Sequence, residues 1–143
     1  MTTGPQSLAA RANARIRGRF PGLVGLEFVE LTSDRVLVRL EVREELKQPW
    51  GTLHGGAIAT LLDTAAAAGA VANLGPGLQS LTVEIKVNFI GAVRGGVVTV
   101  EAVPLHRGRT TMIWESRARD AQGRIVAAGL STHMTIPSER PPD

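Results

Sequence analysis

The segment from Gly51 to Asp63 contains the residues best suited to chemistry. His54 is followed by Gly55 and Gly56, and then by an apolar stretch whose one charged residue is Asp63. Glycines at the start of a helix leave backbone N–H groups uncovered beside the positive end of the helix dipole, which suits an anion or an oxyanion. A carboxylate in an apolar helix is costly unless it is hydrogen-bonded or used. The pattern predicts an oxyanion site and a reactive carboxylate, with a tightly packed helix start and a structural Asp as the alternative.

The elements that must position these residues follow from the periodicity of the chain. Residues 55–73 read as one long apolar helix, which Gly75-Pro76-Gly77 ends. Ser7 is expected to cap a short helix over residues 7–17, which Gly18 and Pro21 end. Alternating apolar residues predict strands over 25–31, 35–43, 80–90, 97–105, 110–119 and 124–136.

Short turns join the first two strands and the last three, so the sheet is expected to be mainly antiparallel. The alanines of the long helix make it narrow, and a six-stranded sheet can then curl closely around it. We therefore predict an α+β fold in a single domain over residues 1–143, with a core of about residues 24–136. In the strand over residues 80–90, strict alternation would place Val83, Ile85, Val87 and Phe89 on one face and Thr82, Glu84, Lys86 and Asn88 on the other.

Composition excludes several classes of function. The 143 residues include no cysteine, which removes disulfides, thiolate zinc sites and a cysteine nucleophile, and the three histidines lack metal-ligand spacing. The net charge of +3 is spread over strands and turns, and only three Phe and two Trp occur, which disfavours nucleic-acid binding. A small anionic ligand suits this basic chain better than a nucleic acid does. Residues 55–74 approach membrane-spanning length, but their alanines and Asp63 favour a buried helix, and with no secretory signal visible we expect a cytoplasmic protein without a membrane partner or a cofactor.

The His-Gly-Gly run with an Asp eight residues after its first glycine, set on a small apolar helix followed by strands, resembles the hotdog-fold acyl-CoA thioesterases of the phenylacetic-acid-pathway (PaaI) type. The resemblance covers roughly residues 24–136. It implies that Gly55 offers its N–H to the thioester carbonyl and that Asp63 attacks the thioester or activates water. It also implies an orienting role for His54, and for Thr82 a role in positioning either the water or the carboxylate, with an ordinary strand threonine as the alternative. Where some relatives carry an Asn that binds the carbonyl, this chain has the longer Gln48.

The same resemblance implies where coenzyme A would bind. The residues near the nucleotide and the pantetheine channel would be Phe89, Arg94, His106, Arg107, Gly108, Arg109, Thr110 and His133. For the basic turn over residues 106–110, the alternative to contact with coenzyme A is a solvated hairpin turn. For His133, the alternative is a surface residue.

The spacing of Gly55 and Asp63 bears on assembly. Eight residues at a rise of ~1.5 Å separate them by about 12 Å along one helix, too far to act on one carbonyl. Antiparallel helices of two subunits would bring the Gly55 of one beside the Asp63 of the other, and the resemblance implies that dimer and often a tetramer. We predict a thioester hydrolase acting on an aryl-acyl or medium-chain acyl-CoA, with a non-catalytic acyl-CoA-binding module as the alternative.

Overall fold

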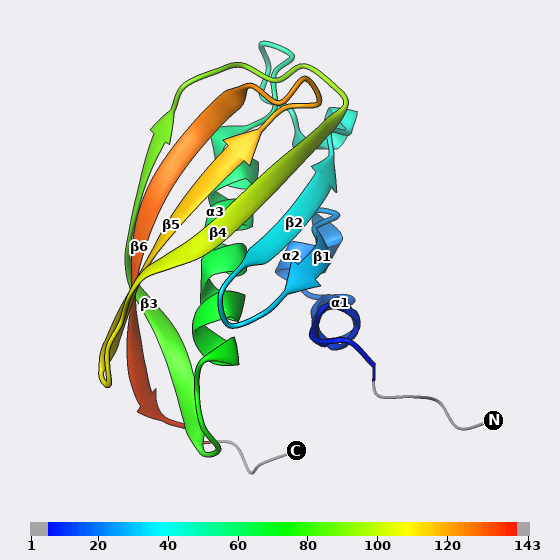
Figure 1. Cartoon of the computed structure of the whole chain (residues 1–143). Coiled ribbons are helices and arrows are strands. Elements are labelled where there is room, and N and C mark those ends of the chain that lie inside the picture. The colour runs from blue at the N-terminus through cyan, green and yellow to red at the C-terminus, as the bar shows by residue number, and fades with distance from the viewer. Residues whose placement is uncertain (1–5, 140–143) are drawn as a thin grey trace, which may run out of the picture.

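The computed structural model describes residues 6–139 and consists of one sheet with a long helix against it (Figure 1). The helices are α1 (Leu8–Ile16), α2 (Phe20–Leu23) and α3 (Gly55–Ala72), with a short 3-10 turn, η1 (Glu44–Leu46), before α3. The strands are β1 (Glu27–Leu31), β2 (Val36–Glu41), β3 (Leu78–Phe89), β4 (Val97–Arg107), β5 (Thr111–Arg119) and β6 (Ile125–Pro137).

The six strands form one sheet in the order β1-β2-β4-β5-β6-β3, and all neighbours are antiparallel. Figure 1 shows the sheet curving along α3, with α1 and α2 beside β1 at one edge and β3 at the other. The predicted long helix, the six strands and the sheet around the helix are confirmed. One element was not predicted: Pro21, expected only to end the first helix, lies in the first turn of α2, where proline needs no N–H acceptor.

The core lies between the concave face of the sheet and α3. Leu61, Leu62 and several alanines of α3 are buried there. Two glycines allow the close approach: a Cβ on Gly69 would meet the ring of Trp114 at 2.3 Å, and one on Gly129 would lie 2.9 Å from the side chain of Leu62. Although α3 is long and apolar enough to cross a membrane by length and composition, it serves here as the core helix of the sheet.

A β-bulge in β3 changes which residues face the helix. Thr82 pairs with His133 and Glu84 pairs with Thr132. Between these two pairs, β3 therefore advances by two residues while β6 advances by one. The extra residue, Val83, breaks the alternation. The prediction of strict alternation is therefore wrong at Thr82, which points to the concave side with Ile85 instead of sharing the outer face of Glu84.

Candidate active site

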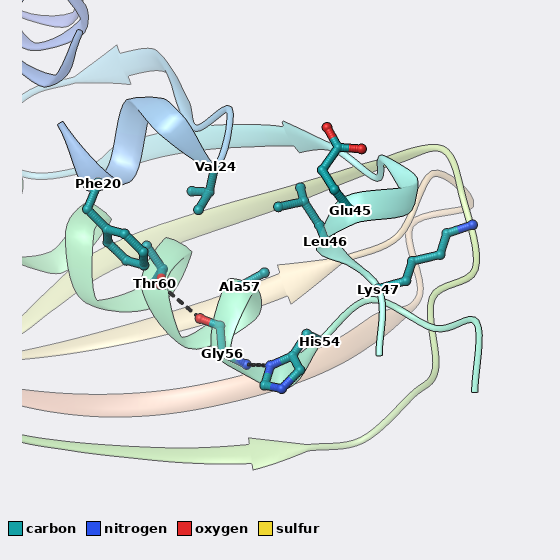
Figure 2. A pocket seen from close by; sticks show the side chains of 9 residues that line it. All are labelled: Phe20, Val24, Glu45, Leu46, Lys47, His54, Gly56, Ala57 and Thr60. Atoms are coloured by element: carbon teal, nitrogen blue, oxygen red, sulfur yellow. Dashed lines mark hydrogen bonds between the residues drawn. The ribbon is translucent and has the colours of Figure 1, made fainter. Parts of the chain in front are cut away.

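His54 begins α3 and fixes the geometry of its first turn. Its backbone is extended, at φ −64° and ψ 135°, and its Nδ1 accepts a hydrogen bond from the N–H of Gly56 at 2.8 Å (Figure 2). An imidazole that accepts at Nδ1 carries its proton on Nε2 when neutral. The exposed His54 therefore presents an Nε2–H donor at the mouth of the helix.

The N–H of Gly55 is left open by this arrangement. The N–H groups of Ala57 and Ile58 both reach the carbonyl of His54, at 2.9 and 3.4 Å, and that of Gly56 is held by the ring. Within residues 6–139, the N–H of Gly55 has no acceptor. Since the first N–H groups of a helix carry partial positive charge, this group is suited to a carbonyl oxygen that gains negative charge.

A cavity of ≈ 410 Å³ opens beside Gly55. Gln48 and Phe89, two of the candidate site residues, line it together with Gly55, and the Phe89 ring lies 3.1 Å from the position of a Cβ on Gly55. The amide of Gln48 already donates to Thr52 Oγ1 at 2.6 Å. Other lining residues, which the sequence did not single out, are Thr52, Leu53, Ile58, Ile90, Gly91 and Ala92.

Arg94 lies beside the loop that contains Gln48. Its guanidinium donates to the carbonyl of Trp50 at 3.2 Å, and the Trp50 side chain is 80% exposed. Arg94 is thus a cation close to the cavity wall. An exposed aromatic next to it is a feature that only the folded loop reveals.

A second cavity of ≈ 310 Å³ lies across the first turn of α3 (Figure 2). Phe20 and Val24, from α2 and its end, and Leu46, from η1, give it an apolar wall, and Thr60 closes its floor. Its other lining residues are Glu45, Lys47, His54, Gly56 and Ala57. Both cavities therefore lie at the first turn of α3: Gly55 lines the larger one, and its neighbours His54 and Gly56 line the other.

Asp63 lies away from both cavities. Its Oδ1 accepts the hydroxyl proton of Thr82 at 2.8 Å, so two of the candidate site residues are in direct contact. Thr82 Oγ1 also lies 3.4 Å from Nδ1 of His133, whose Nε2 is 2.8 Å from Ser131 Oγ. His133 is 1% exposed, which excludes the surface residue that was the alternative and leaves no surface on it for the expected contact with coenzyme A within this chain. Ser131 was missed, although its spacing of two from His133 places both on one face of a strand.

The basic turn over residues 106–110 lies at the opposite end of α3. Arg107 donates to Asp34 Oδ1 at 2.7 Å and to the carbonyl of Ser33 at 3.1 Å, and it contacts Asn73 at the C-cap of the helix. Asn73 is 18 residues from Gly55, or about 27 Å along the helix. Arg109 and Thr110 are exposed. One chain therefore does not bring this turn to the Gly55 cavity.

The site is thus divided within a chain. Gly55 and His54 offer two donors for a carbonyl oxygen at the helix start, and Asp63 offers a carboxylate about 12 Å further along α3. Among residues 6–139, no three histidine or acidic side chains gather as a metal site would require. The chemistry available is oxyanion stabilisation combined with attack or proton removal by a carboxylate.

Comparison with known proteins agrees with this fold and chemistry. The model of the thioesterase superfamily matches residues 51–127. The chain is 32% identical to a 1,4-dihydroxy-2-naphthoyl-CoA hydrolase of Listeria monocytogenes, over 76% of this chain and 89% of that protein. It is 33% identical to the proofreading thioesterase EntH of Cronobacter turicensis, over 84% and 88%. A crystal structure of a thioesterase from Haemophilus influenzae has the same fold, with a TM-score of 0.89, 23% identity and 98% of each chain covered.

An antiparallel sheet wrapped around one apolar helix, taken together with these matches, identifies a hotdog-fold thioester hydrolase. The chain belongs to the thioesterase superfamily.

Proposed function

We propose that this thioesterase hydrolyses an acyl-CoA with an aryl-acyl or medium-chain acyl group, as in the PaaI-type branch of the superfamily. The open N–H of Gly55 carries the proposal, because Gly55 lines one cavity and both of its chain neighbours, His54 and Gly56, line the other. A thioester carbonyl bound to this N–H and to Nε2–H of His54 would be polarised for attack. The negative charge that develops on its oxygen would be stabilised by both donors and by the helix dipole.

Asp63 is the proposed base or nucleophile. With Oδ1 occupied by the Thr82 hydroxyl, Oδ2 has no hydrogen-bond partner within the described residues. In one route Oδ2 removes a proton from water, which attacks the carbonyl carbon, and the C–S bond breaks with the proton going to the CoA thiolate. In the other, Oδ2 attacks the carbonyl carbon and the C–S bond breaks with release of the CoA thiolate. Water then hydrolyses the resulting anhydride, which frees the acid, restores the Asp63 carboxylate and supplies the proton that the thiolate takes up.

The two cavities suggest how the substrate lies. The cavity of ≈ 310 Å³ has an apolar wall formed by Phe20, Val24 and Leu46, and its capacity suits a phenylacetyl or medium-chain acyl group. The other cavity leads from Gly55 past Phe89 toward Arg94 and would take the pantetheine arm.

A second copy of the chain would complete the site. β3 is a twelve-residue edge strand, and Leu81, Val83 and Ile85 on it are 37–53% exposed. Long apolar edges of this kind pair with other strands unless they are covered. A dimer formed along β3, with the partly exposed Ala59 and Ala67 of α3 facing the second copy, would bring the Asp63 of one copy to the Gly55 of the other. It would also bring the turn at Arg107 and Arg109 toward the cavity of the other copy, where the CoA phosphates need cations.

Release of CoA thiol from a panel of aryl-acyl and medium-chain acyl-CoAs tests the proposal, with Asp63→Asn as the decisive variant. The Asn keeps the size and a hydrogen-bonding oxygen but cannot act as base or nucleophile. We expect kcat to fall by about 10²–10⁴-fold while substrate binding persists. A folded variant with near-full turnover would show that Asp63 is structural. Binding without turnover in the wild-type protein would favour the alternative, a non-catalytic acyl-CoA-binding module.

A further inference from the structure

A chain of side chains links Asp63 to the interior of the sheet. From β6, Ser131 Oγ lies 2.8 Å from Nε2 of His133, and Nδ1 of His133 lies 3.4 Å from Thr82 Oγ1. From β3, Thr82 donates to Asp63 Oδ1 at 2.8 Å. Ser131 is 4% exposed and His133 1% exposed. The chain therefore runs from the buried face of the sheet to the carboxylate that is proposed to react.

The bulge at Val83 is what makes this chain possible. Without it, the strand periodicity would turn the side chain of Thr82 to the outer face, away from both Asp63 and His133. Bulges of this kind re-aim side chains next to active sites. The register that pairs Thr82 directly with His133 then places the hydroxyl beside the ring.

The protons of the chain have only one consistent arrangement when Asp63 is ionised. A carboxylate accepts only, so the single hydroxyl proton of Thr82 points to Asp63, and Thr82 can only accept from His133. Nδ1 of His133 must then carry a proton. In the neutral ring Nε2 is left as an acceptor, and Ser131 donates to it. All three hydrogen bonds thus point toward Asp63.

Burial keeps this ring in its neutral form near pH 7. Desolvation lowers the pKa of His133 from 6.5, and the carboxylate of Asp63 opposes that shift only in part. A neutral, buried ring with a fixed tautomer is a rigid hydrogen-bond donor and needs no change of charge to act.

We propose that His133 is a positioning residue for hydrolysis: its Nδ1–H orients the Thr82 hydroxyl, which in turn holds Asp63 with Oδ2 turned outward. This inference rests on the proposed role of Asp63. His133 does not contact the substrate in this scheme. Its effect on turnover passes entirely through Thr82, and that property can be tested.

The first test needs no substrate. In nitrogen-15 NMR of the wild-type protein, the two ring nitrogens of His133 should show Nδ1 protonated and Nε2 unprotonated near pH 7. The signals are assigned by their loss in the His133→Asn variant. A ring protonated on Nε2 alone would overturn the proposal, because it could not donate to Thr82.

The second test compares two replacements of His133. The amide N–H of Asn can take the place of the Nδ1–H donor, whereas Leu fills similar space and donates nothing. We expect His133→Leu to lower kcat by about 10- to 100-fold with KM little changed, because the carboxylate loses its fixed position. His133→Asn should recover most of that loss. Equal kcat values for the two folded variants would contradict a donor role.

A double-mutant cycle with Thr82→Val separates positioning from general damage. If His133 acts through the Thr82 hydroxyl, His133→Leu should have almost no further effect on kcat once the hydroxyl is absent. Additive losses would show that the two residues act independently and would overturn the proposal. If Asp63→Asn abolishes hydrolysis but His133→Leu leaves kcat intact, the inference fails alone. If the wild-type protein hydrolyses no acyl-CoA, the proposed function fails, while the NMR result still decides the tautomer.

Discussion

Each histidine of the site owes its proton arrangement to a neighbour. At the start of α3, the N–H of Gly56 occupies Nδ1 of His54, so this ring has its donor on Nε2, facing the site. In the sheet, Thr82 donates its only hydroxyl proton to Asp63 and can only accept from His133, so the proton of this ring is on Nδ1 instead. His54 thus becomes an exposed donor at the site and His133 a buried donor to Thr82, because the groups beside the two rings differ.

The buried ring also makes a prediction for stability. Its pKa is lowered in the folded chain, mainly by desolvation, whereas in the unfolded chain it titrates near 6.5. Between these values the unfolded state binds more protons, so this contribution to the free energy of unfolding is complete above pH 6.5 and is lost as the pH falls through the folded value. Denaturant titrations from about pH 7.5 to 5 should show a steeper decline for the wild-type protein than for His133→Asn. Equal declines would mean that the ring titrates alike in both states.

At the scale of elements, the distance between α3 and the sheet sets the geometry around Asp63. Gly129 of β6 lies beneath Leu62, the residue before Asp63, and in register with Val87 of β3. A side chain at Gly129 would push Leu62, and with it the helix backbone next to Asp63, away from β6, four residues along the strand from the pair of Thr82 with His133. Close packing of helix on sheet and the position of the carboxylate therefore depend on the same glycine.

We expect Gly129→Ala to cost about 1–3 kcal/mol of the free energy of unfolding, because interiors resist added volume. Its Cβ would lie 2.6 Å from the carbonyl oxygen of Lys86 and 2.9 Å from Leu62, so backbone must shift. The rate of hydrolysis should fall as well, and kcat should change more than KM, because the carboxylate of Asp63 is displaced. Gly75→Ala is the matched control, since nothing lies within 4 Å of its added Cβ. Denaturant unfolding and thiol release measure both variants, and a Gly129→Ala protein as stable and active as the control would refute this account.

At the scale of the whole molecule, the question is how the two halves of the site meet. Gly55, with its open N–H, and Asp63, whose Oδ2 is unpaired among residues 6–139, are about 12 Å apart along one helix, so no movement within a chain joins them. The exposed edge of β3 offers the surface for a second copy.

Mixing two inactive variants tests this composite site. Gly55→Pro removes the N–H, and proline suits the first helical position, particularly after the extended His54 at ψ 135°. When Gly55→Pro and Asp63→Ala subunits are combined in equal amounts and exchange freely, about half of the dimers should contain one subunit of each kind. In each of these heterodimers, one of the two sites should be active. About a quarter of wild-type activity should therefore return.

Gly55→Ala is the control for that experiment, because it keeps the N–H while bringing a Cβ to 3.1 Å from the exposed ring of Phe89. It should retain far more activity than the proline variant. Folded subunits that exchange yet stay inactive when mixed would exclude a site shared between copies.

The sequence by itself determined the fold and the chemical groups of the site. Hydrophobic periods of two and about 3.6 are local signals, so the six strands and the long helix could be predicted, as could the glycines and the carboxylate on that helix. The Thr82–Asp63 hydrogen bond was not predicted as such. Resemblance to known thioesterases implied only that Thr82 positions the water or the carboxylate, and strict alternation would have placed Thr82 on the wrong face.

Only the tertiary structure decided how the side chains face one another. The bulge at Val83 depends on pairing with β6, and the burial of His133 depends on α3 lying across that strand, so neither is encoded in a local period. The same holds for Arg107, whose contacts with Asp34 and Asn73 join segments far apart in the chain. Periodicity reports the environment of one element, whereas these contacts arise from the register and spacing between elements, which the packing of the whole chain sets.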